Sequence, residues 1–292
     1  MKKIIAAVLL LMLVFTGCSQ PQTDQNKITI VTTMFPAYDF AREIAGDKAE
    51  IILLVPTGAE SHSYEPTPKD IITIQNADIF IYNGGESEHW IENLTKEIEL
   101  KNTITMTAFA DKLYTDEGYD EHVWCSPLNV ISISQAIYEQ LCILDPENCD
   151  YYTNNRDSFK KELLELHNTF SEIVKNSENK TVVFADRFPV KYFTEEYGLS
   201  HLSAYHGCSA EAEPSASKIA ELANRVNSEN IKGVFYIEFS DKKIADIICE
   251  ETGCEMYLFH SCHNISKYDL ENGETYITLM TKNAENLRKV LN

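Results

Sequence analysis

Four histidines, in three segments far apart in the sequence, carry side chains suited to binding a transition metal. His62 lies in a proline-containing loop, His122 in a short polar segment, and His260 and His263 just after an apolar run near the C-terminus. Neutral imidazoles are common zinc ligands. A single histidine after a strand is more often an ordinary surface residue, so the prediction rests on the three segments together. They indicate one convergent metal site.

The loop 58–68 is the most informative of these segments. It follows the apolar run 51–56, which predicts a buried strand, and it contains Pro66 and Pro68. Proline fixes its own φ and restricts the residue before it. The loop is therefore expected to be stiff and to hold the imidazole of His62 still at the end of a strand.

Length and charge limit the classes of function. The chain has 292 residues, enough for two domains of ordinary size. Its 25 Lys and Arg against 45 Asp and Glu give a net charge of −20. Such a chain repels phosphate backbones and attracts cations, so no nucleic-acid partner is expected.

The N-terminus is typical of an export signal. Lys2 and Lys3 precede an apolar run that is too short to span a membrane, and small residues then lead to Cys18 and a polar stretch. This pattern resembles a bacterial lipoprotein signal. It implies that residues 1–17 are a signal peptide, that Cys18 is lipidated and that 18–26 form a linker. A signal-peptidase site with an incidental cysteine is the alternative.

Without Cys18, seven of the eight cysteines remain, so they cannot all pair internally. Cys142 and Cys149 are close enough in sequence to form a disulfide, and so are Cys249 and Cys254. Cys262 is a candidate soft metal ligand, although a disulfide is the favoured interpretation.

Two similar halves follow the linker. Apolar strand patterns alternate with amphipathic helix patterns over 27–147 and again over 179–292, while 148–178 carries one long amphipathic pattern. Alternation of this kind predicts α/β lobes with mostly parallel sheets, joined by one long helix. Ligands bind beyond the carboxyl ends of parallel strands, where His62 falls. The acidic stretch 111–121 is expected to be solvated.

Several motifs together resemble the zinc/manganese solute-binding proteins of bacterial ABC transporters, a group that includes lipoprotein adhesins. The resemblance covers nearly the whole mature chain, and these are the segments that carry it: 58–68 (GAESHSYEPTP), 121–124 (EHVW), 197–199 (YGL), 213–215 (EPS), 235–238 (FYIE) and 251–253 (ETG). It implies two α/β lobes joined by a rigid helix, with the metal in the cleft between them.

The resemblance also suggests ligands. The first two family ligands fall on His62 and His122, and Asp186 replaces the usual third, a histidine or glutamate. The fourth, usually aspartate, falls on His260 or His263 depending on the alignment. A salt bridge or a helix cap is the alternative role for Asp186. The histidine-rich loop frequent in the family is missing.

Three imidazoles with one carboxylate favour zinc over manganese, which prefers more oxygen donors. The resemblance therefore implies a monomeric, membrane-anchored protein, not an enzyme, that captures zinc outside the cytoplasm and delivers it to an ABC permease. One alternative is an envelope zinc hydrolase using Glu60, Glu211 or Glu213 as base, although no HExxH motif is present. The other is an adhesin or interaction lipoprotein with a structural metal.

Overall fold

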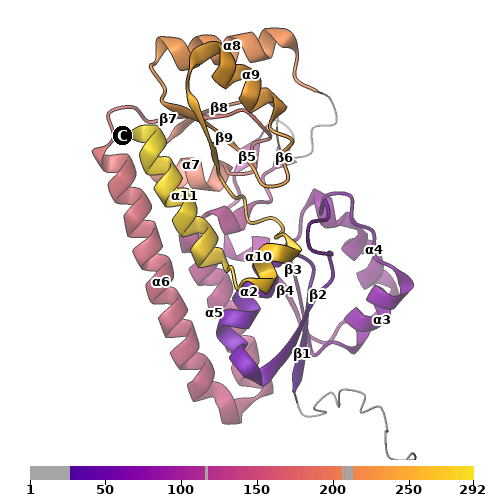
Figure 1. The fold of residues 1–292 in the computed structure, drawn as a ribbon. Coiled ribbons are helices and arrows are strands. Elements are labelled where there is room, and N and C mark those ends of the chain that lie inside the picture. The colour runs from indigo at the N-terminus through magenta and orange to yellow at the C-terminus, as the bar shows by residue number, and fades with distance from the viewer. Residues whose placement is uncertain (1–26, 116–117, 206, 208–212) are drawn as a thin grey trace, which may run out of the picture.

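The computed structural model describes residues 27–115, 118–205, 207 and 213–292 (Figure 1). The expected signal peptide, the linker and Cys18 lie outside the described residues, as do His206 and Glu211. Within the described part of the chain, no helix combines the length and apolarity that a membrane crossing requires.

The first lobe is a four-stranded parallel sheet in the order β2-β1-β3-β4. Its strands are β1 (Ile28–Thr32), β2 (Ala49–Leu53), β3 (Ile79–Tyr82) and β4 (Thr103–Thr105). The helices between them are α2 (Phe35–Ala45), α3 (Pro68–Asn76) and α4 (His89–Glu97), with short 3-10 turns η1 (Gly46–Lys48), η2 (Glu86–Glu88) and η3 (Met106–Phe109). The strands coincide with the β-branched, apolar runs of the sequence, as expected for a sheet covered by helices.

The second lobe repeats this architecture with a parallel sheet in the order β10-β9-β7-β8. Its strands are β7 (Thr181–Phe184), β8 (Ser200–Ser203), β9 (Gly233–Tyr236) and β10 (Glu255–Leu258). Its helices are α7 (Lys191–Tyr197), α8 (Ala216–Ser228), α9 (Lys243–Thr252), α10 (Lys267–Glu271) and α11 (Tyr276–Leu291). The predicted α/β class and the parallel sheets are confirmed.

A long helix, α6 (Cys149–Asn176), runs along both lobes (Figure 1). It follows α5 (Pro127–Leu144) and the 3-10 turn η5 (Pro146–Asn148), and the predicted disulfide Cys142–Cys149 joins its start to α5. Phe159, Leu163 and Phe170 lie at helical spacing and are fully buried in a core that both lobes share. This shared core makes α6 a rigid spine.

The final helix α11 ties the end of the chain back to the first lobe. It packs against α6, and the backbone N–H of Tyr276 donates a hydrogen bond of 2.7 Å to buried Asp39 in α2. The Tyr276 hydroxyl donates to the carbonyl of Trp124, also at 2.7 Å. The first lobe therefore depends on the last sixteen-residue helix for part of its core.

The expectation that the acidic stretch 111–121 is solvated is wrong at its end. Asp111 is exposed, but the stretch includes a small hairpin, β5 (Tyr114–Thr115) and β6 (Gly118–Tyr119), and the two acids that follow it, Asp120 and Glu121, are buried. On the long helix, half-buried His167 pairs with Glu196 of α7 at 2.7 Å. In both cases residues distant in sequence cover a polar side chain.

Candidate metal centre

Three of the predicted histidines come together in the cleft. His62, His122 and His263 each offer a ring nitrogen, and these nitrogens lie within 4.8 Å of one another. The ring centroids are 4.6 Å apart for His62 and His263, 5.3 Å for His122 and His263, and 5.9 Å for His62 and His122. This is the one such grouping of histidine, cysteine or carboxylate donors among the described residues.

The spacing fits a metal after a small contraction. Zinc bonds of about 2.0–2.1 Å in a tetrahedron separate the donor atoms by about 3.3 Å. The observed limit of 4.8 Å therefore has to close by at most ~1.5 Å, which side-chain rotation and loop adjustment can supply. The arrangement can hold one transition-metal ion and leaves a position for a further donor.

The loop of His62 is fixed at both ends. At its far end, Thr67 caps α3 through a capping box with Asp70, and Pro68 occupies the first turn. At its near end, the side-chain amide of Asn264 donates to the carbonyls of Pro56 and Ala59, at 2.9 and 2.7 Å. The predicted stiffness thus comes from a cap and a contact with the second lobe, as well as from the prolines.

Asp120 orients the imidazole of His122. Its Oδ1 accepts the backbone N–H of His122 at 2.8 Å and lies 2.9 Å from Nδ1 of the ring. Burial opposes ionisation of Asp120, but the adjacent His122 outweighs it and lowers the pKa of the carboxyl. A carboxylate on Nδ1 directs Nε2 toward a metal, an arrangement common in zinc sites.

Glu121 stands in the same relation to His62, at a longer distance. Its Oε1 lies 3.5 Å from Nδ1 of His62, and its Oε2 accepts the backbone N–H of Ser87 at 3.2 Å. The carboxylate fits there because residue 85 is glycine: a Cβ on Gly85 would lie 2.0 Å from Oε2 of Glu121. Two consecutive acids therefore each face one imidazole.

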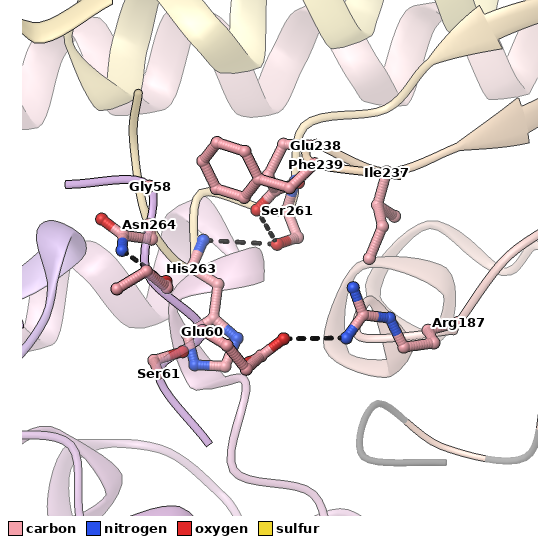
Figure 2. A pocket seen from close by; sticks show the side chains of 11 residues that line it. Gly58, Glu60, Ser61, Arg187, Ile237, Glu238, Phe239, Ser261, His263 and Asn264 are labelled. Carbon is pink, nitrogen blue, oxygen red and sulfur yellow. Dashed lines mark hydrogen bonds and ion pairs between the residues drawn. The ribbon is translucent and has the colours of Figure 1, made fainter. Parts of the chain in front are cut away.

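His263 is held through its backbone. Its N–H donates to Oγ of Ser261 at 3.3 Å, and Glu238 accepts both the N–H and the hydroxyl of Ser261, at 2.7 and 2.5 Å (Figure 2). The ring packs against Trp124 with centroids 5.0 Å apart, and its buried Nε2 has no hydrogen-bond partner among the described residues. Burial, followed by the nearby His62, His122 and Arg187, holds the pKa of His263 well below its usual range.

The other predicted ligands lie outside this group of described residues. Asp186 is buried at the end of β7, where Oδ1 accepts the N–H of Arg187 at 2.8 Å and Oδ2 that of Ile237 at 3.3 Å. His260 is also buried, and its Nδ1 accepts the backbone N–H of Cys262 at 3.0 Å. Both side chains brace the loops around the site in this structure.

Cys262 is a buried free thiol, so the expected disulfide is wrong for this structure. Its backbone has a φ of 60°, in the left-handed region that favours glycine. Its sulfur lies 3.7 Å from the carbonyl of His260 and is not among the converging donors. Burial raises the pKa of the thiol well above its usual value, which disfavours the thiolate that a metal needs.

A cavity of about 260 Å³ opens beside His263, between the lobes (Figure 2). Arg187 of the second lobe crosses it and pairs with Glu60 of the first lobe at 3.0 Å. Burial opposes ionisation of Glu60, but the hydrogen bonds from Arg187 and from the N–H of His62 lower the pKa of its carboxyl. The ion pair joins the two lobes next to the histidines.

Sequence reasoning missed the residues that orient the histidines. Asp120 and Glu121 directly precede His122, which is a usable signal, because acids next to a ligand histidine often contact an imidazole. Glu238 belongs to a segment that carried the resemblance, but nothing near it in sequence indicates its contact with Ser261.

A family described as zinc-uptake complex component A, periplasmic (ZnuA), matches residues 30–290. The chain belongs to this family. The zinc-binding lipoprotein AdcA of Streptococcus pneumoniae is 30% identical over 309 residues, which cover 99% of this chain and 61% of AdcA. The chain thus spans about three fifths of the length of AdcA. The resemblance to metal solute-binding proteins is confirmed.

Two further similarities agree with this family. The high-affinity zinc uptake system protein ZnuA of Bacillus subtilis is 30% identical over 283 residues, covering 91% of this chain and 88% of that protein. The crystal structure of the Zn(II)-bound ZnuA-like domain of Streptococcus pneumoniae AdcA matches with a TM-score of 0.79 at 30% identity, covering 91% of this chain and 99% of that domain. The predicted architecture of two lobes and a long helix is confirmed.

Proposed function

We propose that this protein captures a zinc ion outside the cytoplasm and passes it to an ABC permease for uptake. The observation that carries the proposal is the convergence of His62, His122 and His263 from three distant segments. The zinc-binding and zinc-uptake names of its relatives, and the Zn(II)-bound domain with the same fold, support it. A nitrogen-rich donor set favours zinc over manganese, which prefers more oxygen ligands.

His62, His122 and His263 supply the nitrogen ligands in this proposal. Asp186 supplies the fourth donor by rotating away from its two backbone N–H partners, so that one carboxylate balances part of the metal's charge. His260 does not ligate. It steadies the turn that presents His263, since its ring accepts from Cys262 and its backbone is paired with Asn283.

The proposal includes the membrane anchor and the chain's organisation. Cys18 carries the lipid, the mature chain acts as a monomer, and 27–147 and 179–292 are the lobes that flank the linking segment 148–178. A continuous core along α6 resists wide hinge motion. Metal release accordingly involves small lobe tilts and movement of the ligand loops.

Among the described residues, the alternatives lack a supporting contact. A zinc hydrolase needs a base beside a metal-bound water. Glu60 is instead paired with Arg187, and Asp120 and Glu121 are each directed at an imidazole. At the family level the relatives are metal solute-binding proteins and not enzymes. For an adhesin whose metal is structural, removing zinc would unfold the domain. Here the core that the lobes share, with a smaller apolar cluster in each lobe, holds the fold without a metal, so we expect reversible loss.

Metal content and competition titration of the soluble mature chain test the proposal. One zinc per chain is expected. His62→Ala, His122→Ala and His263→Ala should each weaken zinc binding by at least about a hundredfold, because each removes a direct ligand. Asp186→Ala should weaken it less, and His260→Ala least.

His89→Ala is the matched control, since His89 is an exposed histidine on α4. Its affinity should equal that of the wild type. Zinc bound with unchanged affinity after loss of His62 or His263 would overturn the proposed site. Unfolding of the wild-type chain when a chelator removes the metal would favour the structural-metal alternative.

A further inference from the structure

Cys249 and Cys254 form a second close cysteine pair, in the second lobe. Cys249 lies in the last turn of α9, and Cys254 directly precedes β10. Both are thiols in this structure, both are half-buried, and their sulfurs are 3.2 Å apart. The metal centre uses neither of them.

The backbone between the two cysteines turns back on itself and brings the two sulfurs together. Gly253 ends α9 in the left-handed conformation, with φ of 74°, and reverses the chain. The backbone N–H of Cys254 donates to Oγ1 of Thr252 at 3.3 Å, which fixes the turn. An S–S bond is about 2.05 Å long, so the sulfurs need to approach by only ~1.2 Å.

We propose that Cys249 and Cys254 are a redox-active pair that is oxidised to a second disulfide by a dithiol–disulfide oxidoreductase or a small-molecule disulfide. The sulfur of Cys254 attacks the oxidant's disulfide, forms a mixed disulfide and expels one oxidant thiolate. Cys249 then attacks the Cys254 sulfur, closes the protein disulfide and releases the second oxidant thiolate. The two cysteine protons pass to these thiolates, so the protein loses two electrons that the oxidant gains.

This order of steps follows from the environment of Cys249. Burial and the hydrogen bond with Cys254 raise the pKa of the Cys249 thiol. A thiol with a raised pKa reacts slowly with an external disulfide. Once Cys254 is in the mixed disulfide, it is held beside Cys249, and the second step is intramolecular.

The other cysteines of the described chain outside the Cys142–Cys149 disulfide do not compete. Cys125 and Cys262 are 2% and 0% exposed, inside the core next to the metal centre. An oxidant of the size of a peptide cannot reach them in the folded protein, because reaction requires access as well as a thiolate. Oxidation should therefore be confined to the pair at the end of α9.

A Cys249–Cys254 disulfide would fix the start of β10, the strand that leads to His263. β10 is an edge strand of the second sheet, and its carboxyl end leads through Phe259 to His263. Its amino end begins at Glu255, next to Cys254. A disulfide there holds the start of the strand to α9, opposing local opening of the edge.

Peptide mapping tests the proposal on the folded mature chain. The protein is incubated with oxidised glutathione, alkylated in denaturant and cut with a glutamate-specific protease. Glu250 and Glu251 lie between the cysteines, so cleavage leaves them on separate peptides that only a disulfide can join. The bonded pair Cys142–Cys149 is the internal positive control.

The expected result is a linked pair of peptides containing Cys249 and Cys254, lost on reduction, with Cys125 and Cys262 alkylated. Cys249→Ser should leave Cys254 as a mixed disulfide with glutathione that joins no two peptides of the chain, and the oxidised wild type should unfold at a higher temperature than this variant. Alkylation of both cysteines while Cys142 remains bonded to Cys149 would overturn the proposal. A link from either cysteine to Cys208 would also overturn it.

Discussion

The two lobes present their histidines to the cleft by opposite means. In the first lobe, His62 and His122 each have a carboxylate near Nδ1, from Glu121 and Asp120. In the second lobe, no acid among the described residues pairs with the ring of His263: its backbone is fixed by Ser261, and its ring lies against Trp124. The first lobe thus forms an electrostatically oriented half-site, whereas the second delivers a neutral, desolvated donor. Preorganisation of a metal site can come from charge on one side and from packing on the other.

The two lobes also differ in the hydrogen bonding of their buried acids. Glu238 and Asp186 of the second lobe accept hydrogen bonds from backbone N–H groups. In the first lobe, Glu88 accepts from the N–H of Gly84 through Oε2, but its buried Oε1 has no hydrogen-bond partner among the described residues. Burial raises the pKa of Glu88 from 4.5 to about 7, and the nearby Glu121 adds to the shift.

The largest expected effect concerns this acid. Because the folded state binds the Glu88 proton more tightly than the unfolded state, the contribution of Glu88 to the free energy of unfolding is fully present below about pH 4.5 and is lost as the pH rises through 7. Glu88→Gln removes this charge and should stabilise the metal-free protein by about 3 kcal/mol at pH 8, with little change at pH 4.5. Urea unfolding at the two pH values measures it.

Glu86→Gln is the control for that experiment, because Glu86 is an exposed acid two residues away. It should leave the pH dependence of unfolding as it is in the wild type. Equal stabilisation by Glu88→Gln at both pH values would show that burial of a charge is not the cause.

The next effect in size tests the acid behind His122. Asp120→Asn keeps the shape of the side chain but removes the charge that pairs with Nδ1, and should weaken zinc binding by about ten- to a hundredfold. Competition titration gives the affinity, and circular dichroism checks the fold. An affinity within twofold of the wild type would contradict the electrostatic description of the first half-site.

A smaller loss is expected for the second acid. Glu121 lies 3.5 Å from His62, so Glu121→Gln, which can still accept a hydrogen bond, should weaken zinc binding by about threefold. Glu121→Leu cannot accept one and should weaken it further. Nitrogen NMR of the metal-free protein should show the Nδ1–H tautomer of His62 in the wild type and in Glu121→Gln, but not in Glu121→Leu.

The smallest effect concerns the link between the lobes. Arg187 and Glu60 are partly exposed, with side chains 26% and 47% accessible, so their ion pair is worth less than about 1 kcal/mol. Arg187→Ala should speed zinc release to a chelator by at most about fivefold and leave the fold unchanged. Stopped-flow measurement at low and high salt checks this, because salt should reduce the difference between variant and wild type.

Most helices and strands could be predicted from the sequence, because buried residues recur at helical spacing in the helices and form apolar runs in the strands. The stripe that includes Phe159, Leu163 and Phe170 predicted α6, and apolar runs predicted both sheets. Asp120 and Glu121 were misjudged because charged residues in a polar stretch look solvated. The place of Glu121 depends on Gly85, more than thirty residues earlier, and no local pattern connects the two residues.

The choice between His260 and His263 was beyond the sequence for a different reason. The two alignments differ by three positions, and the turn between the histidines contains no glycine or proline to mark it. The left-handed backbone of Cys262 decides which ring faces the cleft, and a non-glycine residue in that conformation gives no signal in advance. Only the three-dimensional structure of the turn shows that the ring of His263, and not that of His260, faces the cleft.

The contact of α11 with the first lobe also has a consequence for biogenesis. Asp39 and Trp124 receive hydrogen bonds from Tyr276, so the part of the shared core that lies against them is completed only when the carboxyl-terminal helix has emerged and docked. A ribosome-bound chain would expose that core for most of its synthesis. A chain whose core forms this late would stay unfolded enough to pass through a narrow export channel. Folding would be completed only after the whole chain has crossed the membrane.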